Sequence, residues 1–235
     1  MRTIRDVNVV GGAHIPMRLR RVADVSFPTH WANFRLLGFE GTKLSAGMDD
    51  LTESAIVLTL GDVQNSCPIV RIHSQCTTGD VFHSLRCDCH DQLHLALRLI
   101  AEEGNGILLY EHQEGRGIGL MEKLRAYELQ DRGLDTIEAN LQLGHAVDLR
   151  DYHLPVEILR FLKISSVRLI TNNPEKIKAV CEAGIQIAER ISADVPATPF
   201  SMHYLATKSA KLGHLCGQID PVVTSRPSSS DSQRR

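Results

Sequence analysis

Three cysteines place the strongest constraint on how this chain can fold. Cys76, Cys87 and Cys89 lie within fourteen residues, with the spacing C-x10-C-x-C. Free cysteines are often buried in protein cores, but two thiols separated by a single residue resemble a ligand set more than core packing. Thiolates favour Zn²⁺ over Mg²⁺ or Ca²⁺, and three protein ligands leave a fourth tetrahedral position open for water or substrate. The spacing therefore predicts a catalytic zinc site.

A fourth protein ligand is the alternative to this interpretation. Three histidines near the cysteines could supply it, namely His73, His83 and His90. A fourth ligand would close the coordination sphere and make the zinc structural. The sequence alone leaves this alternative open.

Composition narrows the classes of function. The chain has 235 residues, 43% of them hydrophobic and 23% charged, which fits a globular protein of one large or two small domains. The formal net charge of −2 provides no basic field for DNA or RNA, so an anionic small ligand would need a local basic cluster.

The sequence contains no apolar run that could span a membrane and no secretory signal at its start. We expect a cytoplasmic protein with no membrane or nucleic-acid partner, whose clustered thiols bind metal rather than form disulfides.

Apolar patterns predict alternating strands and helices. Strands are predicted at residues 56–60, 69–73, 107–110 and 167–170, and helices at 92–102, 120–131, 155–162 and 174–182. Residues 1–25 lack a clear pattern and are expected to be only partly ordered. The Ser- and Arg-rich residues 217–235 are expected to form a disordered tail. The alternation favours the α/β class (mixed α+β), as a single domain in which helices flank a mixed sheet.

A glycine-rich segment, EGRGIG at residues 114–119, stands between a predicted strand and a predicted helix. It is neither a Walker A sequence nor a GxGxxG match. Backbone N–H groups at such a helix start can bind an anion, although the same glycines could equally form a tight turn. Arg116 within the segment favours phosphate, because a guanidinium group binds phosphate oxygens bidentately.

Two other polar segments fit either a ligand or a structural role. In TNNPEK, at residues 171–176, Thr171 could cap the following helix or bind a ligand. Lys176 opposes the helix dipole, which favours a ligand somewhat, although a solvated lysine is the common outcome. In DLRDY, at residues 148–152, Asp148 and Arg150 would share one side of an extended stretch. Local sequence there favours a surface ion pair.

Together, these motifs resemble the GTP cyclohydrolase II family, whose members commit GTP to riboflavin synthesis. The resemblance covers about residues 20–215. It rests on collinear segments: RIHSQCTTGD (71–80), SLRCDC (84–89), QEGRGIGL (113–120), RAY (125–127), DT (135–136), LG (143–144), DLRDY (148–152) and TNNPEK (171–176). We therefore expect a catalytic domain at residues 20–216, an N-terminal extension at 1–19 and the tail at 217–235.

The resemblance implies a role for each matching residue. The three cysteines would bind zinc, Asp148 would be the general acid or base, and Tyr127 would assist at the purine ring. Arg150 would act at the α-phosphate, and we expect it to stabilise charge rather than attack, because arginine is effectively always protonated. The residues implied to bind GTP are Arg71, Ile72, His73, Ser74, Gln75, Gln92, Glu114, Gly115, Arg116, Thr136, Thr171 and Lys176.

The implied reaction opens the imidazole ring of GTP. Zinc lowers the pKa of bound water to about 7, so hydroxide is available at neutral pH for attack at C8. Release of formate and pyrophosphate would give 2,5-diamino-6-ribosylamino-4-pyrimidinone 5′-phosphate, with Mg²⁺ accompanying the triphosphate. Gln92 and Glu114 are candidates to bind the guanine edge. The family is usually dimeric, so a homodimer is expected.

Five positions depart from the usual family pattern. Gln75, Thr77, His90, His112 and His145 stand where relatives usually carry Glu, Leu, Gly, Arg and Phe. The departures suggest a diverged paralogue that stops at a formamidopyrimidine nucleotide or uses an altered nucleotide. A nucleotide-binding protein without turnover and a protein with purely structural zinc are further alternatives.

Overall fold

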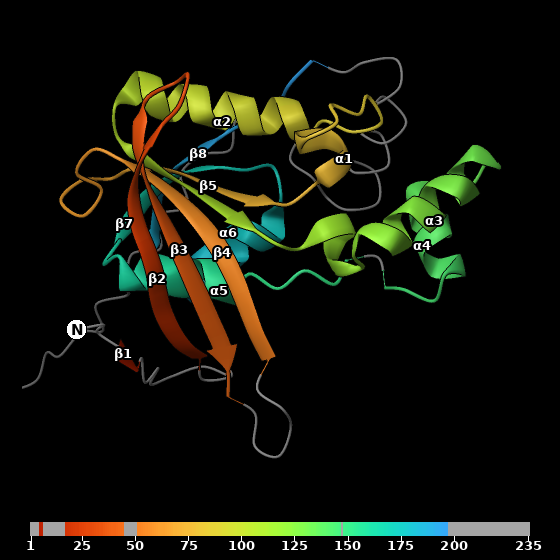
Figure 1. Ribbon diagram of the computed structural model, residues 1–235, viewed down its shortest axis with the longest axis horizontal. Coiled ribbons are helices and arrows are strands. Elements are labelled where there is room, and N and C mark those ends of the chain that lie inside the picture. The colour runs from red at the N-terminus through yellow and green to blue at the C-terminus, as the bar shows by residue number, and fades with distance from the viewer. Residues whose placement is uncertain (1–4, 7–16, 45–50, 147, 197–235) are drawn as a thin grey trace, which may run out of the picture.

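One mixed sheet forms the framework of the molecule. The computed structural model describes residues 5–6, 17–44, 51–146 and 148–196. Within these residues, eight strands pair in the order β1-β2-β3-β4-β6-β5-β7-β8 (Figure 1). The strands are β1 (Arg5–Asp6), β2 (Met17–Pro28), β3 (Asn33–Lys43), β4 (Leu51–Leu60), β5 (Ile69–Ser74), β6 (Gly106–Glu111), β7 (Ser166–Ile170) and β8 (Gln186–Ile191).

Helices lie on both faces of the sheet and beyond its end. They are α1 (Thr77–Asp80), α2 (Cys89–Glu103), the 3₁₀ helix η1 (Glu114–Gly117), α3 (Leu120–Asp131), α4 (Thr136–Gln142), α5 (His153–Phe161) and α6 (Pro174–Glu182). Figure 1 shows α3 and α4 side by side, projecting away from the sheet. The arrangement confirms the predicted α/β class. In the described residues, no helix is long and apolar enough to cross a membrane.

The sheet has an antiparallel part and a parallel part. Strands β1 to β4 and β6 pair antiparallel, and the long β2, β3 and β4 extend past the helices in Figure 1. Strands β6, β5, β7 and β8 pair parallel. Parallel neighbours need crossover connections, which α2, α5 and α6 provide. Both faces of the parallel part are therefore covered.

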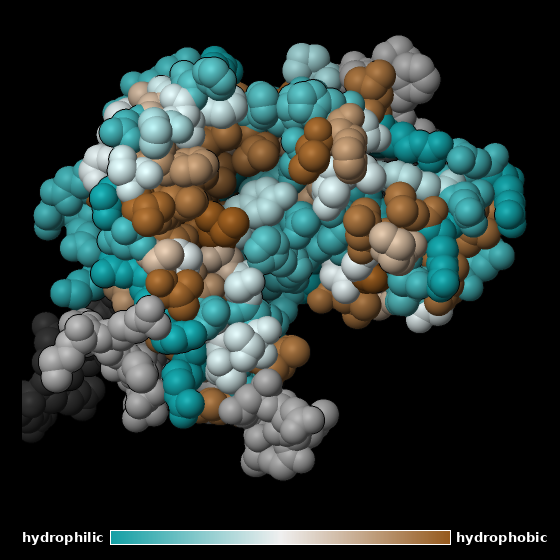
Figure 2. All heavy atoms as spheres, in the orientation of Figure 1, coloured by the Kyte–Doolittle hydropathy of each residue, from teal (hydrophilic) through white to brown (hydrophobic). Residues whose placement is uncertain are grey.

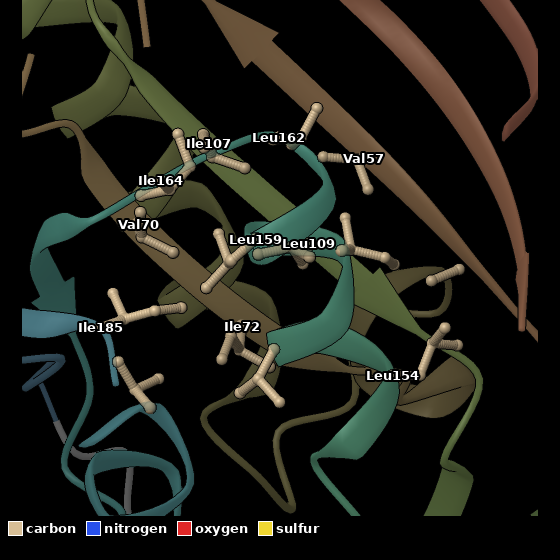
Figure 3. Close-up of a cluster of buried hydrophobic side chains, with 14 of the residues drawn as sticks. Val57, Val70, Ile72, Ile107, Leu109, Leu154, Leu159, Leu162, Ile164 and Ile185 are labelled. Atoms are coloured by element: carbon tan, nitrogen blue, oxygen red, sulfur yellow. The ribbon is translucent and has the colours of Figure 1, made fainter. Parts of the chain in front are cut away.

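Two clusters of apolar side chains pack these helices onto the sheet. On one face, Leu159 of α5 packs with Val70, Ile72 and Leu109 of the sheet (Figure 3). On the opposite face, the buried side of α2 packs with Ile69 and its neighbours. Successive side chains of a strand point to opposite faces. Ile72 therefore lies in the core beneath α5, whereas residues 71 and 73 of β5 point toward α2.

The structure corrects two expectations from the sequence. The prediction that residues 1–25 are only partly ordered is wrong for residues 17–25, which belong to β2. Only Met17 and Leu19 of this strand are buried, so backbone pairing with β3 forms it without a long apolar alternation.

The helix predicted from Pro155 begins at His153. Proline is tolerated there because first-turn N–H groups lack intrahelical acceptors. The expected tail at 217–235 lies outside the described residues.

Candidate active site

A cleft lies at the carboxyl ends of the parallel strands. The chain leaves β5 toward α2 on one face of the sheet, and after β6 and β7 it reaches α5 and α6 on the other face. Such a switch leaves a crevice outside the strand ends, where open α/β sheets commonly bind ligands. A cleft of about 1090 Å³, open to solvent, occupies this position, and residues of α3 and α4 also line it.

Most of the residues expected from the sequence meet in this cleft. Those that line it are Arg71, His73, Ser74, Gln75, Cys76, Cys87, Cys89, Gln92, Gly115, Arg116, Tyr127, Thr136, Arg150, Thr171 and Lys176. Three expected residues do not line it, namely Ile72, Glu114 and Asp148. Ile72 is a core residue, and its backbone carbonyl accepts a hydrogen bond from the lining residue Lys176.

The three cysteine thiols converge at one end of α2. Their Sγ atoms all lie within 4.8 Å of one another, and those of Cys76 and Cys87 are 3.7 Å apart. Gly79 of α1 makes this approach possible, because a Cβ there would lie 3.0 Å from Cys87 Sγ and 3.1 Å from Cys76 Sγ. A side chain at this position would push the thiols apart.

Among the described residues, no histidine or carboxylate joins the three thiols in a common ligand group. His73 Nε2 instead lies 3.1 Å from Asp80 Oδ1. The ring of His90 instead lies tilted against those of His83 and His94, with both centroid distances 3.9 Å. The fourth-ligand alternative therefore gains no support from this geometry.

The thiols have the chemistry of a zinc-binding set. Hydrogen bonds with the other two thiols lower the pKa of Cys76. The hydrogen bond to Cys76 raises the pKa of Cys87 to about 11, and that of Cys89 is also raised well above its ordinary value. Only one of the three thus ionises readily without a cation, because their negative charges repel. A dication would allow all three to ionise, and soft thiolate donors fit Zn²⁺.

Lys123 of α3 is a site residue that the sequence analysis missed. Its Nζ lies 3.1 Å from Cys76 Sγ, 2.9 Å from Thr78 Oγ1 and 2.7 Å from Glu114 Oε1. Glu114 is buried, and its second oxygen accepts a hydrogen bond of 2.6 Å from Thr77 N. Glu114 therefore holds the cysteine loop and Lys123 together from behind the cleft. The only sequence signal was that Lys123 stands four residues before Tyr127, on the same helix face.

Two buried cations, Arg71 and Lys176, face the cleft, and neither forms a salt bridge with a carboxylate of the described residues. Arg71 donates to Ile170 O at 3.1 Å and to Gln92 Oε1 at 2.7 Å, and its Nε has no partner among the described residues. Lys176 donates to Ile72 O at 2.8 Å. These acceptors are all neutral, and burial lowers the pKa of both cations. A buried charge is costly unless it is paired, so an anionic ligand in the cleft would stabilise both groups.

Asp148 and Arg150 form a bidentate pair at the edge of the cleft. Arg150 Nε lies 2.9 Å from Asp148 Oδ1, and its Nη2 lies 2.5 Å from Oδ2. Burial opposes ionisation of Asp148, but the hydrogen bonds from Arg150 outweigh it and lower the pKa of the carboxyl. The pairing predicted from the alternate positions is present, and Arg150 lies partly over the ring of Tyr152 with its guanidinium carbon 5.8 Å from the centroid.

The glycine-rich segment forms η1 and then enters α3. Gly115 and Arg116 both have positive φ, at 62° and 63°. Positive φ is uncommon for arginine and often marks a functional site. Arg116 O accepts a hydrogen bond of 2.9 Å from Leu149 N, and a Cβ at Gly117 would lie 3.0 Å from the Leu149 backbone. This close packing brings Arg116 beside the segment that carries Arg150.

Tyr127 and Arg86 pack together on the α3 side of the cleft. The guanidinium carbon of Arg86 lies 4.9 Å from the Tyr127 ring centroid, and Arg86 also pairs with Asp131 at 2.6 Å. The Tyr127 hydroxyl lies 3.4 Å from Thr78 Oγ1. Burial raises the pKa of Tyr127 to about 12, so its hydroxyl keeps its proton at neutral pH.

In TNNPEK, the helix cap is Asn173 rather than Thr171. The Asn173 side chain accepts a hydrogen bond of 2.9 Å from Glu175 N, and its own backbone N–H donates to Thr171 Oγ1 at 3.0 Å. Pro174 takes the first helical position, which it suits because that N–H would have no intrahelical acceptor. Thr171 is left to line the cleft and support the turn.

Three of the five residues that depart from the family pattern form one hydrogen-bonded chain. His112 Nδ1 lies 2.9 Å from Gln75 Oε1, and Gln75 Nε2 donates to Thr77 Oγ1 at 3.1 Å. His145 contacts Glu122, with Nε2 and Oε2 3.2 Å apart. The substituted residues next to Cys76 thus remain joined by hydrogen bonds.

Known proteins with similar sequences cover nearly all of the described region. A family model described as GTP cyclohydrolase II matches residues 20–192. A GTP cyclohydrolase-2 of Escherichia fergusonii is 50% identical over 205 residues, which cover 87% of this chain and 100% of that protein. A GTP cyclohydrolase-2 of Pectobacterium atrosepticum is 52% identical over 200 residues, or 85% of this chain and 98% of that protein.

A solved structure gives a much weaker match. It is that of RibBX, a two domain 3,4-dihydroxy-2-butanone 4-phosphate synthase from A. baumannii. The alignment covers 74% of this chain and 40% of RibBX, with 14% identity and a TM-score of 0.37. This similarity is too low to establish a shared fold.

Proposed function

The chain belongs to the GTP cyclohydrolase II family, and from this premise we propose that it opens the imidazole ring of GTP at C8. The proposed products are formate, pyrophosphate and 2,5-diamino-6-ribosylamino-4-pyrimidinone 5′-phosphate. The observation that carries the proposal is the presence of Arg71 and Lys176, two buried cations that form no salt bridge within the described residues, in the same cleft as the three thiols. A substrate that offers both a polyphosphate and a hydrolysable ring suits this combination.

The three cysteines would hold the zinc, which when bound supplies a water of lowered pKa and a Lewis acid. The chain's other residues bind and orient the nucleotide. Arg71, Arg116 and Lys176 neutralise the phosphates, and Mg²⁺ accompanies the triphosphate. Magnesium is proposed here because a triphosphate commonly carries it.

Asp148, Arg150 and Tyr127 supply the remaining chemistry. The lowered pKa of Asp148 keeps it ionised at neutral pH, so it can accept a proton. Arg150 stays protonated and stabilises charge at the α-phosphate as pyrophosphate leaves. Tyr127, whose pKa is raised to about 12, can donate a hydrogen bond to the purine.

Gln75, Thr77 and His112, which depart from the usual family pattern, form one hydrogen-bonded chain beside Cys76. It maintains polar contacts across the loop that carries Cys76. The diverged paralogue remains the second candidate, favoured by the same substitutions. A paralogue that stops at a formamidopyrimidine nucleotide would release no formate, and one that uses an altered nucleotide would leave GTP unchanged.

We further propose that the protein forms a homodimer in the cytoplasm. Apolar side chains are exposed on α3 and α4, including Met121, Leu124 and Leu141. Figure 2 shows apolar side chains gathered over this part of the molecule. Covering them would remove apolar surface from water. Size-exclusion chromatography with light scattering tests this proposal, and a monomer at micromolar concentration would contradict it.

Two measurements separate the proposed hydrolase from its alternatives. Formate release from GTP should be lost in Cys87→Ser, whereas a non-catalytic nucleotide-binding protein would release none in either form. GTP with Mg²⁺ should raise the melting temperature of the zinc-loaded protein, because a ligand that binds the native state stabilises it. The absence of any GTP-dependent shift would support purely structural zinc and overturn the proposal.

A further inference from the structure

Beside Lys123, which pairs with Glu114, helices α3 and α4 present several uncharged polar residues to the cleft. On α3, Tyr127 and Gln130 line the cleft three residues apart, and on α4, Thr136 and Asn140 do so four residues apart. Residues at these spacings lie on one helix face. The two helices therefore turn one face each toward the same space.

Asn140 is the most informative residue of this surface. It is 3% exposed, and its side-chain amide makes no hydrogen bond to any residue that the structure describes. Neither amide atom of Asn140 is among the fully buried polar atoms that lack a partner, so the amide still reaches the open space of the cleft. Because Asn140 lines the cleft, a ligand group can supply the missing partners. The side-chain amide of Gln130 also makes no hydrogen bond within the described residues, although Gln130 is less buried.

The positive charges near this surface are already paired. Lys123 contacts Glu114, and Arg86 contacts Asp131. Arg71 and Lys176, which form no salt bridge in the described part of the chain, belong instead to β5 and the start of α6. The cleft thus has a cationic side suited to phosphates and an amide side suited to an uncharged polar group.

We propose that Asn140, together with Gln130, binds the edge of the purine base and determines the preference for guanine. The inference rests on the proposed function and deepens it by assigning base recognition to α3 and α4. Guanine presents an acceptor at O6 and donors at N1 and the 2-amino group. Two primary amides can satisfy all three, because each offers a carbonyl acceptor and two N–H donors.

This assignment differs from the one expected from the sequence. Gln92 and Glu114 were candidates for the guanine edge, but both are engaged elsewhere. Gln92 accepts from Arg71 and donates to Asp88 at 2.6 Å, and both Glu114 oxygens accept hydrogen bonds from Thr77 and Lys123. Asn140 and Gln130 are the amides of the cleft that keep their side-chain groups available.

Binding of GTP and of inorganic tripolyphosphate tests the proposal, because tripolyphosphate has no base. Titration calorimetry on the zinc-loaded protein should show that Asn140→Leu, which keeps the branched shape of the side chain but replaces its amide with methyl groups, weakens GTP binding about tenfold or more. Tripolyphosphate affinity should stay within about twofold, because no base contact is lost. Gln142→Ala, at an exposed position of α4 outside the cleft, is the matched control and should leave both affinities unchanged.

Guanine preference is measured with inosine triphosphate, which lacks the 2-amino group. The ratio of kcat/KM for GTP to that for inosine triphosphate should fall about tenfold in the double variant Asn140→Leu and Gln130→Leu. An unchanged ratio, or unchanged GTP affinity in Asn140→Leu, would overturn the inference. The inference would also be overturned if Asn140→Leu and the smaller change Asn140→Ser each weakened GTP and tripolyphosphate binding by the same factor. Asn140 would then stabilise the fold and not bind the base.

The proposed function and the assignment of base recognition to Asn140 and Gln130 can be contradicted by different results. If the wild-type protein neither binds GTP nor releases formate from it, the proposed function is wrong. If the wild-type protein turns over GTP while the Asn140 variants retain base-dependent affinity, only the assignment of base recognition is wrong.

Discussion

Lys123 donates a hydrogen bond to Cys76, with Nζ 3.1 Å from Sγ. The contact places a positive charge against the most readily ionised of the three thiols. Burial lowers the pKa of Lys123, but contacts with Cys76 and Glu114 raise it, and the net result is a raised pKa. Lys123 therefore stays charged at neutral pH. It joins the metal-binding loop to the helix that carries Tyr127.

Removal of this charge should weaken zinc binding. Partners that orient and balance metal ligands typically contribute 10- to 100-fold to affinity, so we expect a loss of about that size in Lys123→Met. Competition with a chromogenic chelator measures it. Lys123→Arg, which keeps the charge, should lose less, and equal affinity of Lys123→Met and wild type would show that the contact has no role at the metal.

A methyl group at Gly79 should disrupt the thiol cluster directly. The new Cβ would lie 3.0 Å from Cys87 Sγ, closer than ordinary van der Waals contact. We expect Gly79→Ala to bind zinc at least about tenfold more weakly, measured by the same competition. Gly38→Ala on β3, whose nearest neighbours are side-chain atoms of Val22 and Ala23, is the control and should retain the wild-type zinc affinity.

Replacement of Lys176 should separate stability from ligand binding. Its amino group forms no salt bridge within the described residues, and burial lowers its pKa, so Lys176→Met should leave the free protein about as stable as wild type. The stabilisation by saturating tripolyphosphate, about 2.7 kcal/mol at one hundred times Kd, should largely disappear. Thermal unfolding with and without tripolyphosphate measures both effects.

Lys178, exposed on the same helix, provides the control through Lys178→Met. This variant should respond to tripolyphosphate as the wild type does. If Lys176→Met also retained the full response, Lys176 would not bind phosphate.

The Asp148–Arg150 pair should make stability depend on pH. The folded-state pKa of Asp148 lies below the ordinary value of 3.8, so its stabilising effect is present above 3.8 and is lost as the pH falls through the folded pKa. Asp148→Asn should be about 1 kcal/mol less stable than wild type at pH 7. The difference should shrink in strong acid. Urea unfolding at several pH values measures it, and a difference independent of pH would contradict the ion pair.

Local patterns in the sequence predicted much of the parallel part of the fold. The strand at 69–73 and the helix at 120–131 have strong apolar or helical spacing, and the structure places them at β5 and α3. Strand β2 was missed because most of its side chains are exposed and its stability comes from pairing with β3. Helix α4 was missed because it is short, although Asp135 and Glu138 form a capping box that the sequence could have revealed.

The site was predictable where neighbours in sequence are neighbours in space. The cysteine spacing and the alternate positions of Asp148 and Arg150 both indicated real contacts. The Lys123–Cys76 contact joins residues far apart in the chain, so only the packing of α3 against η1 and the cysteine loop reveals it. Ile72 was included through the family motif, whereas strand alternation would have assigned it to the core.

The products of GTP turnover test the central claim most directly. Zinc-loaded protein incubated with GTP and Mg²⁺ should release formate and pyrophosphate in equal amounts, and mass spectrometry should identify 2,5-diamino-6-ribosylamino-4-pyrimidinone 5′-phosphate. Formate without pyrophosphate, pyrophosphate without formate, or unchanged GTP would contradict the account.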